Sequence, residues 1–233
     1  MSRIRLVAPL LMAAGVTLIM LGGCVASHQA RDVEIKGTLL VNSDILEKGA
    51  EDEALYRYRN PKADLKKYTK VLIEPVIVIK SAELDPADLE NYQKLSNNAY
   101  VYLVQELEKD YQVVQTSEPG TLRIQMAIID ADTSKPVRNF LSTFIPVGMA
   151  VSAMKYGVTG KASAVGEISG EFRVADANTG ELLGAAVDRR VGGKELKGIW
   201  DTWYNADDAL KFWARGASYA LCKSRGGSSC IKP

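Results

Sequence analysis

The stretch that decides the fold of this 233-residue sequence is Glu167-Ile-Ser-Gly-Glu-Phe-Arg-Val-Ala-Asp-Ala-Asn-Thr-Gly-Glu-Leu-Leu-Gly-Ala-Ala-Val-Asp-Arg-Arg190. Its first half alternates polar side chains with apolar ones at Ile168, Phe172 and Val174, as a half-buried strand does. A turn follows over Asp176-Ala-Asn-Thr-Gly180, where the glycine is able to adopt a positive φ. The chain then returns from Leu182 to Arg190, so the sequence predicts an antiparallel hairpin.

Three further strands are predicted upstream of this hairpin. The nearly continuous β-branched run from Val71 to Ile79 is typical of a strand that is covered on both faces. Pro75 cannot donate to a β-ladder and therefore predicts a bulge or an edge position. A short strand is predicted from Tyr111 to Gln115, and an alternating strand from Leu122 to Ile128.

Two helices complete the predicted order. Asp85 is a suitable cap for the first, and Pro86 suits its first position. Its apolar stripe has helical spacing and consists of Tyr92, Leu95, Ala99, Leu103 and Leu107. The second starts near Asn205 and ends before Gly226-Gly227. The order β-α-β-β-β-β-α predicts an α+β fold in which helices pack on a mostly antiparallel sheet.

The first 23 residues have the pattern of a secretory signal peptide. Arg3 and Arg5 precede an uncharged apolar run from Leu6 to Leu21. The run closes on Leu-Gly-Gly-Cys24, which resembles the lipobox of bacterial lipoproteins. That resemblance implies a lipid anchor on Cys24, with a diacylglyceryl group and an added acyl chain such as palmitate. An uncleaved transmembrane anchor is the alternative, but the proline and glycines within the segment count against it.

This pattern divides the chain into three parts. By resemblance to sorting in Gram-negative bacteria, Val25 after the cysteine indicates the outer membrane, with the protein facing the periplasm. Residues 1–23 are the expected signal peptide and 24–54 the lipidated N-terminus and a tether, which includes one apolar piece, Gly37 to Val41, able to dock. Residues 55–233 are the expected single α+β periplasmic domain.

Charge and cysteine content limit the partners. The 29 basic and 28 acidic residues form no basic stripe, which argues against nucleic acid as a partner. In an oxidising compartment, Cys222 and Cys230 are expected to form a disulfide. A metal site is the rival interpretation, and it lacks a nearby histidine.

The sequence contains few residues or motifs that are typical of catalytic sites. The only histidine, His28, lies close to the expected anchor, and the sequence has no P-loop, dinucleotide fingerprint or nucleophile elbow. Asp130 and Asp132 are the nearest pair of carboxylates, and solvated side chains are expected there. Asp188-Arg-Arg190 could present a charged cluster, but cross-strand pairing is expected instead. We therefore expect no enzyme activity and no cofactor.

Two segments are candidate contact surfaces. Trp200 and Trp203 are the expected exposed aromatics, because tryptophan is frequent at interaction hot spots, whereas Trp213 is expected in the core. The apolar arm from Phe140 to Gly166 is expected to fold onto the body. Its alternative role is self-association or contact with a partner.

Several phrases together resemble a known bacterial lipoprotein family, domain of unknown function 3313. They are Leu55-Tyr-Arg-Tyr-Arg-Asn-Pro61, Tyr68-Thr-Lys-Val-Leu-Ile-Glu-Pro-Val76, Asp176-Ala-Asn-Thr-Gly-Glu181, Ala186-Val-Asp-Arg-Arg190 and Trp203 to Ala214. The resemblance covers most of the mature chain and implies a lipoprotein, without an activity. The order of elements is also similar to that of periplasmic lipoproteins that assist envelope assembly or secretion, including the curli secretion lipoprotein and the penicillin-binding-protein activator.

Together these features predict a non-enzymatic, lipid-anchored protein that binds or assists an envelope partner. The alternative is a self-assembling, homo-oligomeric structural or secretion component of the outer membrane.

Overall fold

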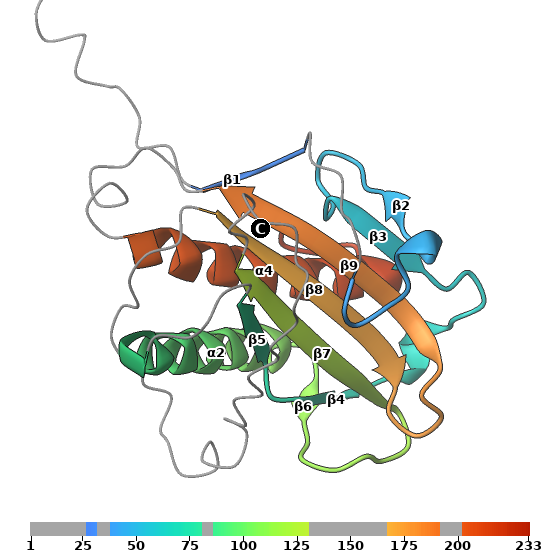
Figure 1. Ribbon diagram of the computed structural model, residues 1–233. Helices are drawn as coiled ribbons and strands as arrows, with labels where there is room; N and C mark the ends of the chain where they lie inside the picture. The colour runs from blue at the N-terminus through green and yellow to red at the C-terminus, as the bar shows by residue number, and fades with distance from the viewer. Residues whose placement is uncertain (1–26, 32–37, 81–85, 131–166, 192–201) are drawn as a thin grey trace, which may run out of the picture.

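The computed structural model of the chain describes residues 27–31, 38–80, 86–130, 167–191 and 202–233. In these ranges two long helices lie on one face of a mixed, mostly antiparallel sheet (Figure 1). This is the α+β class that the sequence predicts.

The hairpin of β8 (Glu167–Asp176) and β9 (Leu182–Val191) forms the centre of the sheet. The strand order is β2-β3-β9-β8-β7-β4-β6, with β1 pairing to β9 and β5 to β7. The remaining strands are β1 (His28–Gln29), β2 (Glu47–Lys48), β3 (Tyr56–Arg59), β4 (Lys70–Ile73), β5 (Ile77–Lys80), β6 (Gln112–Val113) and β7 (Thr121–Asp130), and two short 3-10 helices span Ser43–Ile45 and Leu65–Lys67. The pairs β4–β6, β4–β7 and β5–β7 are parallel, and the other pairs are antiparallel.

The turn of the hairpin forms as its residues predict. Gly180 has a φ of 74°, a left-handed conformation that glycine adopts without steric strain. One carboxylate oxygen of Asp176, Oδ1, accepts hydrogen bonds from the N–H groups of Asn178 (2.9 Å) and Thr179 (3.0 Å). These local hydrogen bonds stabilise the turn that joins β8 to β9.

The predicted strand from Val71 to Ile79 is divided at Pro75. β4 ends with Ile73 opposite Ile124. β5 begins with Ile77 opposite Ala127. The chain around Pro75 thus advances four residues while β7 advances three, and one extra residue of this kind is a β-bulge. The bulge predicted from the proline is confirmed.

The two helices pack on each other and on the sheet. They are α2 (Pro86–Leu107) and α4 (Thr202–Ser224). Pro86 is the first residue of α2, as predicted, and every member of its predicted apolar stripe is buried. The second helix begins at Thr202, three residues before the predicted start near Asn205. Trp213 is 4% exposed and lies in the core, as predicted.

The described residues of the expected tether are not free, which corrects that part of the prediction. His28 and Gln29 pair with the end of β9. Farther along, β2 pairs with β3 and extends the sheet. These strands have two residues each, which is too short for an alternating pattern to show in the sequence.

The apolar piece within the expected tether docks on the sheet. The side chain of Glu171 is 1% exposed, and its Oε2 accepts hydrogen bonds from the N–H groups of Leu39 (2.7 Å) and Leu40 (3.0 Å). Because Gly170 faces α4, the next residue points to the opposite face of the sheet. Burial raises the pKa of Glu171, and the two N–H donors act in the opposite direction.

Candidate functional site

The polar feature that stands out in the described part of the chain is a buried cluster at one end of the sheet. It joins β1, β9 and α4, which are far apart in the sequence and adjacent in space (Figure 1). We call it the N-terminal polar cluster, and its members are Ser27, Gln29, Asp188, Arg190, Asp208 and Trp213.

Arg190 and Asp208 hold Ser27 from two sides. The hydroxyl of Ser27 donates to Asp208 Oδ2 at 2.5 Å. The guanidinium of Arg190 donates through Nε to Ser27 Oγ at 3.1 Å and through Nη2 to the backbone carbonyl of Ser27. Arg190 also stacks on Phe212, with Cζ 3.7 Å from the ring centroid. Ser27 and Arg190 are each 6% exposed, so these bonds are shielded from water.

The cluster holds one guanidinium and two carboxylates, which act on one another electrostatically. Burial lowers the pKa of Arg190, and the carboxylates of Asp188 and Asp208 oppose this effect. An arginine keeps its proton in such surroundings because its unperturbed pKa is far above neutral. Removing either carboxylate would leave a buried cation with less compensation.

Asp188 is the acceptor that links the strands to the helix. Its Oδ2 accepts from Trp213 Nε1 at 2.7 Å. Its Oδ1 accepts from the backbone N–H of Leu55 at 3.2 Å and from the side-chain amide of Gln29. Asp188 is 2% exposed, so its hydrogen bonds connect β1, the residue before β3 and α4 through β9 inside the protein.

The neighbouring acidic residue Asp207 faces the other helix. Its Oδ1 accepts from the hydroxyl of Tyr102 at 2.8 Å and from the amide of Asn98 at 3.3 Å. Lys211 pairs with Asp207 at 2.7 Å, one turn along α4. The adjacent carboxylates at 207 and 208 therefore fix the start of α4 to α2 and to Ser27 respectively.

The sequence-predicted contact residues fall largely outside this cluster. Cys24, Trp200, Asp132 and the arm from Phe140 to Gly166 lie outside the described residues. Trp203 is in the first turn of α4, and its side chain is outside what the structure describes.

Two more of the predicted positions lie on the sheet. Asp130 ends β7, and its side chain too is outside what the structure describes. His28 is exposed on β1, opposite Val191.

Sequence reasoning undervalued the segment Asp188-Arg-Arg190. The sequence predicts cross-strand pairing for it, whereas Asp188 and Arg190 are buried members of the polar cluster. The available signal was their spacing: two charged residues two apart share one face of a strand whose other residues, apart from Gly184 and Arg189, are alanine, valine and leucine. Charges on a buried face require partners, and such a pattern indicates a specific internal contact.

Cys222 and Cys230, the pair expected to bond, form a disulfide with 5.7 Å between their Cα atoms. The bond closes the segment that follows α4. Arg225 in this segment packs over the ring of Tyr111 at 4.3 Å from the centroid, which fixes the segment beside the end of α2.

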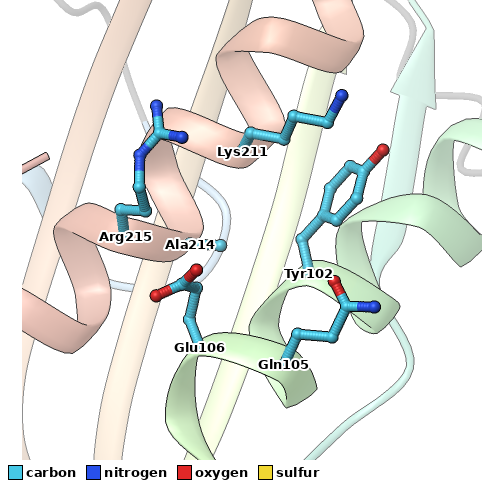
Figure 2. A pocket seen from close by; sticks show the side chains of 6 residues that line it. All are labelled: Tyr102, Gln105, Glu106, Lys211, Ala214 and Arg215. Atoms are coloured by element: carbon cyan, nitrogen blue, oxygen red, sulfur yellow. The ribbon is translucent and has the colours of Figure 1, made fainter. Parts of the chain in front are cut away.

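A shallow hollow lies between the two helices, on the side away from the sheet. It measures about 210 Å³ and is lined by Tyr102, Gln105, Glu106, Lys211, Ala214 and Arg215. Figure 2 shows three of these side chains coming from α2 and three from α4. Ligand pockets are usually larger, about 300–1,000 Å³, and predominantly apolar, so this hollow is not assigned to a ligand.

The described residues contain neither a candidate metal site nor a membrane-spanning helix. They contain no group of three or more His, Cys, Asp or Glu side chains placed to hold a metal ion. No helix among them is long and apolar enough to cross a membrane.

A family model, "Protein of unknown function (DUF3313)", matches residues 36–217. The chain belongs to the DUF3313 family. This confirms the family resemblance found in the sequence. The matched range includes Asp188, Arg190 and Asp208, and begins after Ser27.

No curated protein matches the chain significantly. Among solved structures, the chain is similar to the PelC dodecamer from Paraburkholderia phytofirmans, with 10% identity, a TM-score of 0.33 and coverage of 74% of this chain and 96% of that one. It is also similar to a DUF4136 family protein from Bacteroides thetaiotaomicron, with 15% identity, a TM-score of 0.37 and coverage of 73% and 95%. At these identities and TM-scores, neither likeness bears on what this chain binds or how it assembles.

Proposed function

We propose that this member of the DUF3313 family is a lipoprotein of the outer membrane that faces the periplasm and binds an envelope partner without catalysing a reaction. The observation that carries the proposal is the position of Ser27, which is buried in the domain only three residues after the lipobox cysteine, Cys24. A domain that takes up the start of the mature chain in this way is suited to work at a membrane surface.

The disulfide and the polar cluster also support the proposal. The bond between Cys222 and Cys230 suits an oxidising compartment such as the periplasm. Each charged side chain of the N-terminal polar cluster is hydrogen-bonded to Ser27 or Trp213, and these bonds hold elements together. Trp203, at the start of α4, is the residue we assign to partner contact.

Cross-linking in intact cells tests this function. Wild type, Cys24→Ser and Trp203→Ala would be compared by mass spectrometry, with Lys223→Ala at the opposite end of α4 as the matched control. We expect envelope proteins to be captured by wild type and by the control, and to be lost from both other variants while their circular dichroism is unchanged.

Two results would contradict the proposal. Partners retained by folded Trp203→Ala would remove that residue from the contact surface. Cross-links only between copies of this chain would replace partner binding by the self-assembling component that the sequence offers as the alternative.

A further inference from the structure

Among the described residues, Ser27, at the end of the sheet that carries β1, lies nearest in sequence to the expected lipid anchor on Cys24. We propose that this end lies against the bilayer surface, so that the domain is held in one orientation by its own N-terminus. The inference rests on the proposed lipidation of Cys24. It adds which surface of the domain faces the membrane, how far that surface lies from the anchor, and which end points away.

The chain is fixed to the domain from Ser27 to Arg31. Side-chain bonds hold Ser27 to α4 and β9, as described above, and the backbone continues the attachment. The N–H of Ala30 donates to the carbonyl of Arg189 at 2.9 Å. Arg31 then donates to the carbonyl of Ala50 at 2.6 Å. Neither end of this short segment is free to move away from the domain.

The segment between the lipid-bearing Cys24 and the buried Ser27 is short. Three residues from Cys24 to Ser27 span at most about 11 Å when extended. A flexible tether from Cys24 to residue 54 would instead have a root-mean-square length of about 30 Å. The polar cluster therefore removes most of the freedom that such a tether would give.

The end of the sheet that we place against the membrane is formed by several strand ends that lie side by side. Strand registers place a row of residues across the sheet there: His28 pairs with Val191, Val191 with Glu167, and Asp130 with both Ile168 and Lys80. Figure 1 shows β1, the ends of β5, β7 and β9, and the first turns of α2 and α4 gathered on this side.

The opposite end is distant and is formed by turns. Asn60 donates to Glu181 Oε1 at 3.0 Å, and Ser117 donates to Asn178 Oδ1 at 2.6 Å, so three turns meet there. β8 has ten residues, and at about 3.3 Å per residue it separates the two ends by about 30 Å. The turn end should therefore project into the periplasm.

Energy transfer in vesicles tests the orientation. Single cysteines would be introduced as His28→Cys at the near end and Asn178→Cys at the far end; both native residues are exposed. The lipidated full chain, labelled with a donor, would be placed in vesicles of phosphatidylethanolamine and phosphatidylglycerol that carry a headgroup-labelled acceptor. We expect several-fold stronger transfer from position 28 than from position 178.

A linker variant provides the control. A Gly-Ser segment of about twenty residues between Ala26 and Ser27 has a root-mean-square length of about 25 Å and leaves the cluster itself unchanged. Transfer from the two positions should become similar in this variant. If wild type already shows equal transfer, or if the linker leaves the difference unchanged, the proposed orientation is wrong.

The same samples separate this inference from the proposed function. Intact mass and vesicle flotation report whether Cys24 carries lipid. Unmodified protein that does not float overturns both proposals. Lipidated, floating protein with equal transfer overturns the orientation alone.

Discussion

Gly170→Ala should destabilise the domain because a methyl group has no room there. A Cβ at this position would lie 2.8 Å from Cζ3, 2.9 Å from Cε3 and 3.0 Å from Cη2 of Trp213. The indole cannot retreat easily, because Nε1 donates to Asp188 at 2.7 Å and the ring meets Phe172 edge-on at 6.2 Å between centroids.

The expected loss follows from overpacking. Insertion of an extra group into a close-packed core costs about 1–3 kcal/mol, so we expect about 2 kcal/mol for this site. The stabilisation that alanine gives by restricting the unfolded chain, about 0.4–1 kcal/mol, is smaller. For a domain of this size, a loss of 2 kcal/mol corresponds to a fall in Tm of about 4–8 °C.

Urea unfolding of Cys24→Ser protein, with and without Gly170→Ala, measures this loss. Gly184→Ala is the matched control in the adjacent strand, because a Cβ there would meet only the carbonyl oxygen of Tyr58 at an ordinary 3.5 Å. Combining Gly170→Ala with Trp213→Phe should cost less than the sum of the two single changes, since the smaller ring relieves the clash. If Gly170→Ala is as stable as Gly184→Ala, the assigned packing of the helix on the sheet is wrong.

Three further predictions concern the cluster, the buried carboxylate and the disulfide. Asp188→Ala should lower the free energy of unfolding by about 3–5 kcal/mol, because it leaves Trp213 Nε1–H and other buried donors without their acceptor; a loss below about 1 kcal/mol in urea unfolding would contradict this. Burial raises the pKa of Glu171 above its ordinary value of 4.5, so the folded state binds its proton more tightly and the contribution of Glu171 to stability should fall as pH rises from 4.5 through the raised pKa. The stability of Glu171→Gln relative to wild type should therefore be greater at neutral pH than below pH 4.5, and a constant difference would refute the assignment. Replacing Cys222 and Cys230 by serine should cost about 2–3 kcal/mol in thermal or urea unfolding, and no loss would show that the short loop needs no bond.

The sequence predicted those elements that local patterns determine. The central hairpin carries a strand pattern and a turn pattern in one stretch. Alternating polar and apolar residues predict its strands, and Gly180 permits its turn. The bulge at Pro75 was predictable for the same reason, because a residue without an N–H group interrupts a ladder wherever it occurs.

The N-terminal polar cluster could not be predicted in this way. Ser27 and Asp208 are 181 residues apart, and no local pattern indicates that their side chains meet. β1 has two residues, and its place is determined by tertiary bonds to Arg190 rather than by propensity. In the sequence, only the charged pair Asp188 and Arg190 indicated such a cluster. The two side chains are buried because β9 packs against α4, a contact that no local pattern predicts.

We propose that the mature protein begins at a lipid-bearing Cys24 and is held at a membrane. Intact-mass analysis of the protein extracted from membranes, followed by sequencing of its N-terminal peptide, tests this most directly. We predict a chain that starts at Cys24 and carries the added mass of a diacylglyceryl group and an acyl chain, whereas Cys24→Ser protein should carry no lipid mass. A protein that retains Met1, or an unmodified Cys24 in the soluble fraction, would contradict the claim.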